Sequence, residues 1–346
     1  MAPVLPTAFL ERLDTEARDL LLSVARQVSF MKGAQLVRHG EPARGAWVLR
    51  EGAAEAVVML PGGESLAVAQ LGAGSVFGEM ALLDFGACTA TVNATVNVDG
   101  WFVDRDDFRA LVAQRNPASL RIQHAFTLIL IDKLRQLNAR VLACASDEDR
   151  PARPEDPGRD PLEGIARSRH VEFDWRGFLT RLPAFDGFDA SEVDEIAELG
   201  KLVELPRGAA VFVAGQAAEA TFLVVRGAVE MVARHGAMER RVAVLGPGQL
   251  FGFMSMLEGH AHGVSGYARE AVHLLEIPKA RFDSVYLQAG PTATKLHRTI
   301  HRSLLGSLAQ TNRRLTRLIS QARFGARTAQ NAELSAAYHG QLVAGV

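Results

Sequence analysis

The chain contains one internal repeat, and this repeat constrains the fold more than any other feature of the 346 residues. Each half begins near an aspartate, Asp14 or Asp189, that is placed to cap a helix, and Gly52 of the first half lies opposite Gly227 of the second. The aligned segments are 13–33 with 188–208, 74–80 with 248–254, and 134–140 with 308–314. Because the similarity runs through the whole of each half, we interpret the chain as two copies of one domain.

Each copy is expected to be mainly β with flanking helices. Between Gly33 and Val103, glycine or proline interrupts the first copy every eight to twelve residues, and the intervening runs are rich in strand-forming residues. This spacing favours an antiparallel sandwich or barrel. Apolar residues at three- and four-residue steps then predict long helices over 119–142 and 299–319. The predicted fold is two antiparallel β-barrels of the jelly-roll type, each followed by a long C-terminal helix.

The repeat divides the chain into four parts. Between the copies, half of the residues from 147 to 170 are charged and four are proline. Such a segment buries too little apolar surface to fold on its own, so we expect a linker. The predicted parts are the first domain (1–143), the charged linker (144–170), the second domain (171–324) and a tail (325–346).

The composition argues against several classes of protein. Thirty-eight basic and thirty-nine acidic residues give a net charge of −1, so no excess of positive charge indicates binding to nucleic acid or to a membrane. Two cysteines, Cys88 and Cys144, favour neither a disulfide framework nor a thiol metal site. The N-terminus lacks the pattern of a signal peptide, and no apolar run is long enough to cross a membrane. We therefore expect a cytoplasmic protein.

Residues 77–90, which we name the first cassette, carry the most distinctive motif. Phe77-Gly78-Glu79 leads into an apolar stretch that begins at Met80. With the helix–barrel–helix order, this motif resembles the cyclic-nucleotide-binding domain, the module shared by the catabolite activator protein family and the regulatory subunits of cyclic-nucleotide-dependent kinases. The resemblance extends over most of both copies. It implies a regulatory domain that binds a nucleotide inside the barrel.

The resemblance assigns a role to each candidate residue. A tight turn at Gly78 lets the backbone approach a ligand, and the unpaired N–H groups of the short helix that follows would point at an anion. Glu79 would accept a hydrogen bond from a ribose hydroxyl. The candidate ligand-binding residues are Phe77, Gly78, Glu79, Met80, Ala81, Leu82, Cys88, Thr89 and Ala90. The expected ligand is a cyclic mononucleotide or a cyclic dinucleotide, with no further cofactor and no metal.

The first cassette departs from the family pattern at Cys88, where the family has an arginine that grips the cyclic phosphate. No Arg or Lys lies between Phe77 and Trp101. A charge-assisted contact to a buried phosphate contributes roughly 1.5–3 kcal/mol, so its loss predicts binding that is about 10- to 150-fold weaker. Two alternatives stay open: Glu79 as an inherited barrel residue, and Cys88 as either a redox-sensitive thiol or a small group that fills a vacated pocket.

Residues 251–264, which we name the second cassette, depart further. Phe253 replaces the carboxylate, and His262 stands where the family has its arginine. His262 could replace that arginine below about pH 6.5, bind a metal together with His260, or lie on a solvated turn. Apolar side chains at Phe253 and Met254 favour a structural second copy. This second, degenerate pocket consists of Phe251, Gly252, Phe253, Met254, Ser255 and His262.

These features favour a non-catalytic regulatory protein that acts by ligand-modulated protein–protein interaction. The alternative is an interaction scaffold that has lost its ligand. No catalytic residues are assigned, because no nucleophile–base pair, metal cluster or phosphate loop indicates an enzyme. Residues 325–346 contain no basic recognition helix, which argues against a transcription regulator and against direct DNA binding. The long helices 119–142 and 299–319 are candidates for self-association, within one chain or between two chains, or for binding a partner protein.

Overall fold

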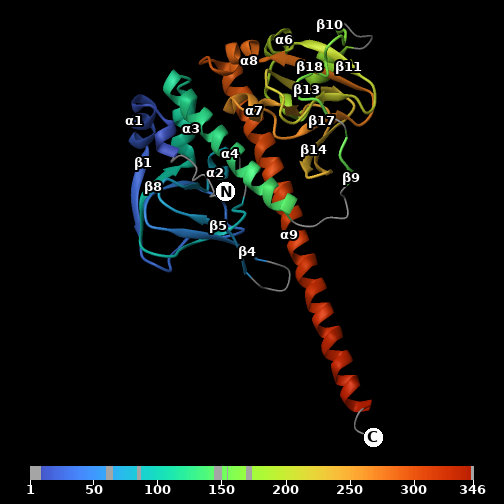
Figure 1. Ribbon diagram of the computed structural model, residues 1–346. Coiled ribbons are helices and arrows are strands. Elements are labelled where there is room, and N and C mark those ends of the chain that lie inside the picture. The colour runs from blue at the N-terminus through green and yellow to red at the C-terminus, as the bar shows by residue number, and fades with distance from the viewer. Residues whose placement is uncertain are drawn as a thin grey trace.

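The computed structural model contains two β-barrels, one from each copy, on either side of two long helices (Figure 1). The described residues are 9–59, 65–83, 87–143, 150–153, 155–168 and 174–343. All strand pairs in both barrels are antiparallel. The mainly β, jelly-roll class that the sequence predicts is therefore confirmed.

The first barrel consists of two four-stranded sheets, with strand orders β1-β8-β3-β6 and β2-β7-β4-β5. Two short helices precede it, one short helix lies between β6 and β7, and two helices follow it. The elements are η1 (Phe9–Arg12), α1 (Thr15–Ser23), β1 (Ala25–Phe30), β2 (Gln35–Val37), β3 (Gly45–Glu51), β4 (Ala54–Met59), β5 (Ser65–Leu71), β6 (Val76–Phe77), α2 (Met80–Leu83), β7 (Thr91–Ala94), β8 (Val98–Asp104), α3 (Arg105–Ala113) and α4 (Pro117–Ala143).

Local sequence explains where these elements begin and turn. Asp14 caps α1, because its carboxylate accepts a hydrogen bond from the Ala17 N–H at 2.9 Å. Gly52 has a φ of 91°, and a Cβ there would lie 2.1 Å from the Asn97 carbonyl oxygen, so the close approach of two backbones requires this glycine. One apolar cluster joins the flanking helices to a sheet, and a separate cluster fills the barrel interior.

The second barrel repeats this plan with one more strand in each sheet. The strand orders are β10-β11-β18-β13-β16 and β12-β17-β14-β15-β9. Asp189 caps α6 through a capping box, in which its carboxylate accepts from the Glu192 N–H and the Glu192 carboxylate accepts from the Asp189 N–H. The elements are β9 (Arg150–Pro151), β10 (Arg167–Ser168), α5 (Trp175–Leu179), η2 (Pro183–Phe185), α6 (Ala190–Glu198), β11 (Lys201–Leu205), β12 (Ala210–Phe212), β13 (Ala220–Arg226), β14 (Val229–His235), β15 (Met238–Leu245), β16 (Leu250–Phe251), α7 (Phe253–Glu258), β17 (Ser265–Ala268), β18 (Val272–Pro278), α8 (Lys279–Tyr286) and α9 (Pro291–Val343).

The segment between the copies lies against the second barrel. β9 pairs with β15 and β10 pairs with β11, which supplies the additional strand of each sheet. Leu162 is buried in the apolar cluster of this barrel. Arg153 forms an ion pair with Glu230 at 2.5 Å and lies over the ring of Tyr267 at 4.0 Å. The segment expected to be a linker thus packs against the second copy and adds a strand to each of its sheets.

α4 and α9 pack along each other and join the two copies. Thr127 of α4 hydrogen-bonds to His301 of α9 at 2.7 Å within this interface. The shared core cluster contains Leu130, Ile131, Leu134, Leu137 and Val141 from α4, and Leu296, Ile300, Leu304, Leu305, Leu308 and Leu315 from α9. Of the two helix pairings that the sequence leaves open, the structure contains the one within the chain.

α9 is longer than the sequence predicts. It runs from Pro291 to Val343, so most of the expected tail continues the helix, and its C-terminal part extends beyond both barrels (Figure 1). Residues 325–343 contain no proline and are rich in alanine, which has the highest helix propensity. The helical spacing of apolar residues ends near residue 319, so this spacing predicts a helix only to that point.

Candidate functional site

The first cassette begins at the junction of β6 and α2. Phe77 ends β6 and is buried in the barrel interior, and Gly78 then turns the chain with a φ of 74°. A Cβ at Gly78 would lie 2.7 Å from the Gly45 carbonyl oxygen, so the turn requires glycine. Gly252 of the second cassette has an equivalent φ of 84°. Both cassettes therefore contain the glycine turn that the motif predicts.

Glu79 is buried and paired with a lysine of α4. Its side chain is 5% exposed, and its Oε1 lies 2.8 Å from Nζ of Lys133. Lys133 also donates a hydrogen bond to the Val76 carbonyl oxygen at 2.9 Å. The first cassette therefore has a cation beside it, although its own sequence supplies none.

Two backbone amides at the start of α2 already have partners. The Ala81 N–H donates to the Gly78 carbonyl oxygen at 2.9 Å, and the Leu82 N–H donates to the Glu79 carbonyl oxygen at 3.1 Å. The Ala81 and Leu82 side chains are buried, and Met80 packs against the core cluster of α4 and α9. This cassette consequently offers fewer free amides to an anion than its motif suggests.

The end of the first cassette is fixed to a neighbouring turn. The Cys88 N–H donates to the Glu41 carbonyl oxygen at 2.8 Å, and the Cys88 carbonyl oxygen accepts from the Gly40 N–H at 2.9 Å. Burial, together with the nearby Glu41 carboxylate, raises the pKa of the Cys88 thiol. A raised pKa opposes the reactive thiolate and favours a packing role. Thr89 is exposed, and Ala90 packs against the cluster inside the barrel.

The second cassette is filled by its own side chains. Phe253, which occupies the position of Glu79, is buried in the core cluster around the long helices. His262 is 5% exposed and stacks on Phe212, with the ring centroids 3.8 Å apart. Burial, with a contribution from the charge of Arg135, lowers the pKa of His262 to about 4. His262 is therefore neutral near pH 7 and offers no charge to a phosphate.

Arg135 of α4 extends to this second cassette. Its Nη2 lies 2.5 Å from Oε2 of Glu258, the last residue of α7, and donates to Oγ of Ser255 at 3.2 Å. Phe251 packs inside the barrel, and Met254 packs against the cluster of the long helices. The long helix of the first copy thus contacts the cassette of the second copy directly.

The sequence did not identify Lys133 and Arg135 as cassette contacts. Both residues belong to the long helix, and the nearer of them, Lys133, lies 43 positions after residue 90, the end of the first cassette. One signal was available: Asp132, Lys133 and Arg135 follow an uncharged run that begins after Arg121. Charged groups at the centre of a long apolar helix indicate contacts with other buried polar groups.

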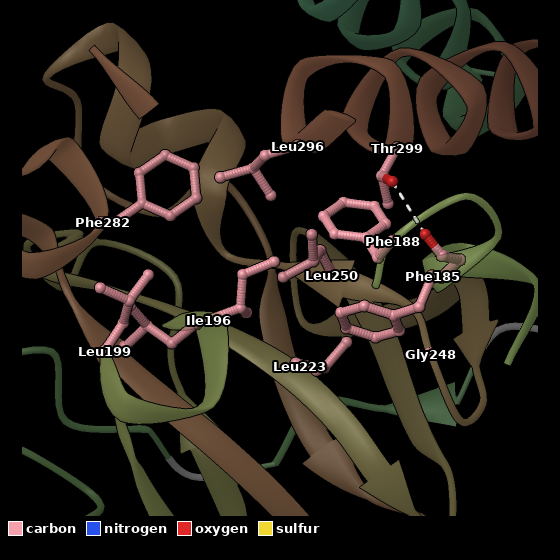
Figure 2. A pocket seen from close by; sticks show the side chains of 12 residues that line it. Phe185, Phe188, Ile196, Leu199, Leu223, Gly248, Leu250, Phe282, Leu296 and Thr299 are labelled. Atoms are coloured by element: carbon pink, nitrogen blue, oxygen red, sulfur yellow. Dashed lines mark hydrogen bonds between the residues drawn. The ribbon is translucent and has the colours of Figure 1, made fainter. Parts of the chain in front are cut away.

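A separate pocket in the second copy belongs to the apolar core (Figure 2). Figure 2 shows Phe188, Leu250 and Leu296 converging on it from different elements. Its volume is about 10 Å³, which is room for no more than one water molecule. We therefore place no ligand there.

Other classes of site have little support in the described residues. In that part of the chain, no group of three or more His, Cys, Asp or Glu side chains is arranged to hold a metal ion. None of the described helices has both the length and the apolar character needed to cross a bilayer. Arg298 and Arg314 of α9 donate to backbone carbonyl oxygens, at 3.1 and 2.9 Å. Cys144 lies outside the described residues.

Both barrels match one family of known proteins. The family model for the cyclic nucleotide-binding domain matches residues 27–115 and 202–289, which together make up just over half of the chain. A cyclic AMP receptor protein from Thermus thermophilus is 36% identical over 96 residues, which are 28% of this chain and 44% of that protein. Glutaminase 1 from Bradyrhizobium diazoefficiens is 34% identical over 132 residues, which are 38% of this chain and 21% of that protein.

The chain thus matches less than half of the length of either relative. A solved cyclic nucleotide-binding domain from Methylobacillus flagellatus is 20% identical and covers 40% of this chain and 82% of that chain, with a TM-score of 0.38. One family match falls within each copy of the repeat. The chain therefore belongs to the cyclic nucleotide-binding domain family and contains two such domains in tandem.

Proposed function

We propose that this chain is a non-catalytic regulatory protein, in which the first copy binds a cyclic nucleotide and the long helices transmit that event to a protein partner. The first cassette carries this proposal, because its glycine turn is intact and the Glu79 carboxylate is retained beside it. The relative from Thermus thermophilus is a cyclic AMP receptor protein, which supports a cyclic nucleotide as the class of ligand.

Binding of cyclic AMP by the first copy is expected to be weak. Cys88 supplies no charge to the phosphate, and two amides of α2 are engaged within the turn. The loss of one charge-assisted contact weakens binding about 10- to 150-fold. A dissociation constant in the micromolar range or above is therefore the expected result for the wild-type chain.

The second copy serves as structural support in this proposal. Phe253 and His262 are buried within it, and His262 carries no charge near pH 7. A nucleotide would have to displace these packed side chains, which costs stability without a charged contact in return. One ligand per chain is consequently expected.

The alternative function is an interaction scaffold that binds no nucleotide. The pairing of Glu79 with Lys133 favours it, because a carboxylate that already has a charged partner gains less from a ribose hydroxyl. Catalysis is not part of either proposal. The similarity to the glutaminase extends over 21% of that enzyme.

Calorimetric titration of the full chain with cyclic AMP, cyclic GMP and a cyclic dinucleotide tests the proposal. We expect one site per chain, which Glu79→Ala abolishes and which Glu51→Ala, a change at an exposed glutamate of the same barrel, leaves intact. No binding of any of the three ligands by the folded protein would overturn the sensor proposal and leave the scaffold.

A further inference from the structure

A polar cleft of about 310 Å³ opens on the surface of the second barrel, and its described lining residues belong to neither cassette. The end of α6, the start of β11, the end of β18 and the start of α8 border it, together with β10. This volume is at the lower end of the range of small-molecule sites, roughly 300–1,000 Å³. Five of the described residues that line it are charged: Arg167, Glu198, Lys201, Glu276 and Arg281.

Both carboxylates of the cleft are already paired with arginines. Arg167 donates two hydrogen bonds to Glu276, from Nε to Oε2 at 2.5 Å and from Nη2 to Oε1 at 3.2 Å. Arg176 of α5 pairs with Glu198, and also with Asp194 at 3.2 Å. Charge-assisted contacts of this kind engage the acceptor oxygens of a carboxylate. The glutamates therefore have little attraction left for an incoming cation.

The other two charged groups of the cleft, Lys201 and Arg281, are exposed cations without a counter-charge. Among the residues that the structure describes, none forms an ion pair with either side chain. A concave surface lined by charges of one sign focuses their field and raises the local concentration of counter-ions. The unopposed charge of the cleft is positive, so its chemistry favours an anion.

The first copy supplies from its own sequence the carboxylate that this cleft lacks. Arg26 of β1 lies 175 positions before Lys201, and it pairs with Asp104 of β8 at 3.8 Å. The counterpart of Asp104, 174 positions further along the chain, is Pro278. The cation at the start of this strand is thus retained in both copies, but its internal partner is present only in the first.

A second acidic position of the first copy has changed the sign of its charge. Asp107 of α3 corresponds to Arg281 of α8, and the buried phenylalanines that follow them, Phe108 and Phe282, support this alignment. Relative to the first copy, two carboxylates are missing and one cation has been added. Like charges that share a surface repel each other, and a bound anion relieves that repulsion. The local arrangement is therefore unfavourable alone and favourable with a ligand.

We propose that this cleft binds a small phosphorylated metabolite, whose phosphate takes the place of the missing carboxylate beside Lys201 and Arg281. The guanidinium of Arg281 offers a planar fork of N–H donors that matches phosphate oxygens, and Lys201 adds a compact charge. A phosphate monoester carries about −1.5 to −2 charges at pH 7, which suits two cations better than one carboxylate does. The rest of the volume holds the uncharged part of the ligand, whose hydroxyl groups suit the polar walls.

Phosphorus NMR on the full chain at low ionic strength tests this site, with ribose 5-phosphate as the probe. Binding should broaden the phosphorus signal, and inorganic phosphate should bind more weakly because it leaves most of the cleft empty. Arg281→Asp, which introduces the acidic residue of the first copy, should weaken binding at least about 10-fold. Pro278→Asp should do the same, because its carboxylate would occupy the cation as Asp104 does in the first copy.

Two matched variants separate the cleft from other sources of attraction. Lys279, on the same helix as Arg281, pairs with Asp283 at 2.6 Å and does not line the cleft. Binding should therefore persist in Lys279→Met, and also in Glu79→Ala, which alters the first cassette. Equal weakening in Lys279→Met and Arg281→Asp would overturn the site, because only the overall charge of the surface would then matter.

Three other results would also overturn the proposal. Loss of binding in Glu79→Ala would place the phosphate in the first cassette, so the test distinguishes this site from the proposed nucleotide site. Inorganic phosphate that binds as tightly as ribose 5-phosphate would exclude an organic ligand, since charge alone would be recognised. No broadening by the folded wild-type chain would mean that the cleft binds no phosphate.

A variant of β11 keeps the test decisive if Pro278→Asp does not fold. Lys201→Gln removes one of the two cations from an exposed strand position and leaves the start of α8 unchanged. It should weaken binding of ribose 5-phosphate about 2- to 5-fold, the effect of losing one exposed charge contact. Unchanged binding in both Lys201→Gln and Arg281→Asp would place the phosphate outside the cleft and overturn the proposal.

Discussion

The two cassettes share a backbone but differ in the side chains that occupy them. Both turn at a glycine with positive φ, and both follow a phenylalanine buried in a barrel. At three equivalent positions the second copy has the larger side chain: Val37 and Phe212, Ala56 and Met231, Cys88 and His262. At two others the first copy does: Trp47 and Phe222, Val92 and Gly266. The framework of a binding domain can therefore persist after its pocket is filled, and the fold alone does not establish a ligand.

The first barrel also contains an aromatic cluster. Trp47 is half-buried and stacks on Phe77, with the ring centroids 6.1 Å apart. Phe222 and Phe251, at the equivalent positions of the second barrel, both contact Phe212. Trp47 likewise contacts Phe30 and Phe102, so the aromatic rings of both barrels pack against one another.

The largest difference in stability between the copies is expected when the residue after each glycine turn, Glu79 or Phe253, is replaced by alanine. Phe253→Ala should lower the free energy of unfolding by about 3–5 kcal/mol, because it leaves a cavity in the core cluster. Glu79→Ala should cost about 1 kcal/mol, since Lys133 keeps access to solvent and its contact with Val76. Urea unfolding of the full chain measures both. Equal losses would contradict the division into a structural and a ligand-binding cassette.

The next test restores the arginine of the family in each cassette. Cys88→Arg should tighten binding of cyclic AMP by about 10- to 150-fold, because Cys88 is half-buried and one charge-assisted contact is gained. His262→Arg should bring no binding, since the new charge would face the Phe212 ring and Arg135. Isothermal calorimetry compares the two variants. A gain in His262→Arg alone would reverse the roles that we assign to the copies.

Acid should destabilise the second copy and the helix interface. Burial lowers the pKa of His262 and of His301 to about 4, whereas an unfolded chain titrates its histidines near pH 6.5. The unfolded state then binds more protons between these values, so stability is complete above about pH 6.5 and is lost as the pH falls toward 4. Each of these two histidines should contribute a loss of about 2 kcal/mol between pH 7 and pH 5.

Substitution of single histidines shows which histidine causes the loss of stability at low pH. Urea unfolding at pH 7 and pH 5 should show a smaller difference for His301→Asn, which keeps a polar partner for Thr127 but does not titrate. His39→Asn, at an exposed site of the first barrel, should behave as the wild type. An unchanged pH dependence in His301→Asn would mean that other groups control acid stability.

The architecture was predictable from the sequence because local signals determine it. Repeated glycines such as Gly52 and Gly227 mark close backbone approaches, and each has a φ that other residues rarely adopt. The spacing of turns and apolar residues then indicates barrels and helices. The cassette turn at Gly78 was predictable for the same reason.

The partners of the cassettes were not predictable, because they are brought together only by tertiary packing. Composition predicted a charged linker around Arg153, but that arginine pairs with Glu230 and lies over the ring of Tyr267, two buried residues of the second barrel. Likewise, periodicity described α4 as an apolar stripe and gave no direction for Lys133. A charge pattern becomes informative only when the structure shows which buried group of opposite charge it meets.

The smallest expected difference concerns the N-terminal caps of α1 and α6, where the copies should agree. Asp14→Ala and Asp189→Ala each remove a hydrogen bond to a helix amide, and each should cost about 1 kcal/mol in urea unfolding. Asp14 also lies 2.7 Å from Arg121, but that pair is exposed and adds little. Ser191→Ala removes only the hydrogen bond from the Ser191 hydroxyl to the Asp189 carboxylate, and it should cost less than loss of the cap itself.

Similar losses in the two cap variants would mean that divergence between the copies is confined to the cassettes. The helix caps depend on local backbone geometry, which the repeat preserves, whereas the cassettes depend on side chains that fill or leave space. If one cap variant lost more stability than the other by over about 1 kcal/mol, divergence would not be confined to the cassettes. It would show that the frameworks have also diverged, and the smaller pocket residues of the first copy would then be weaker support for a retained ligand.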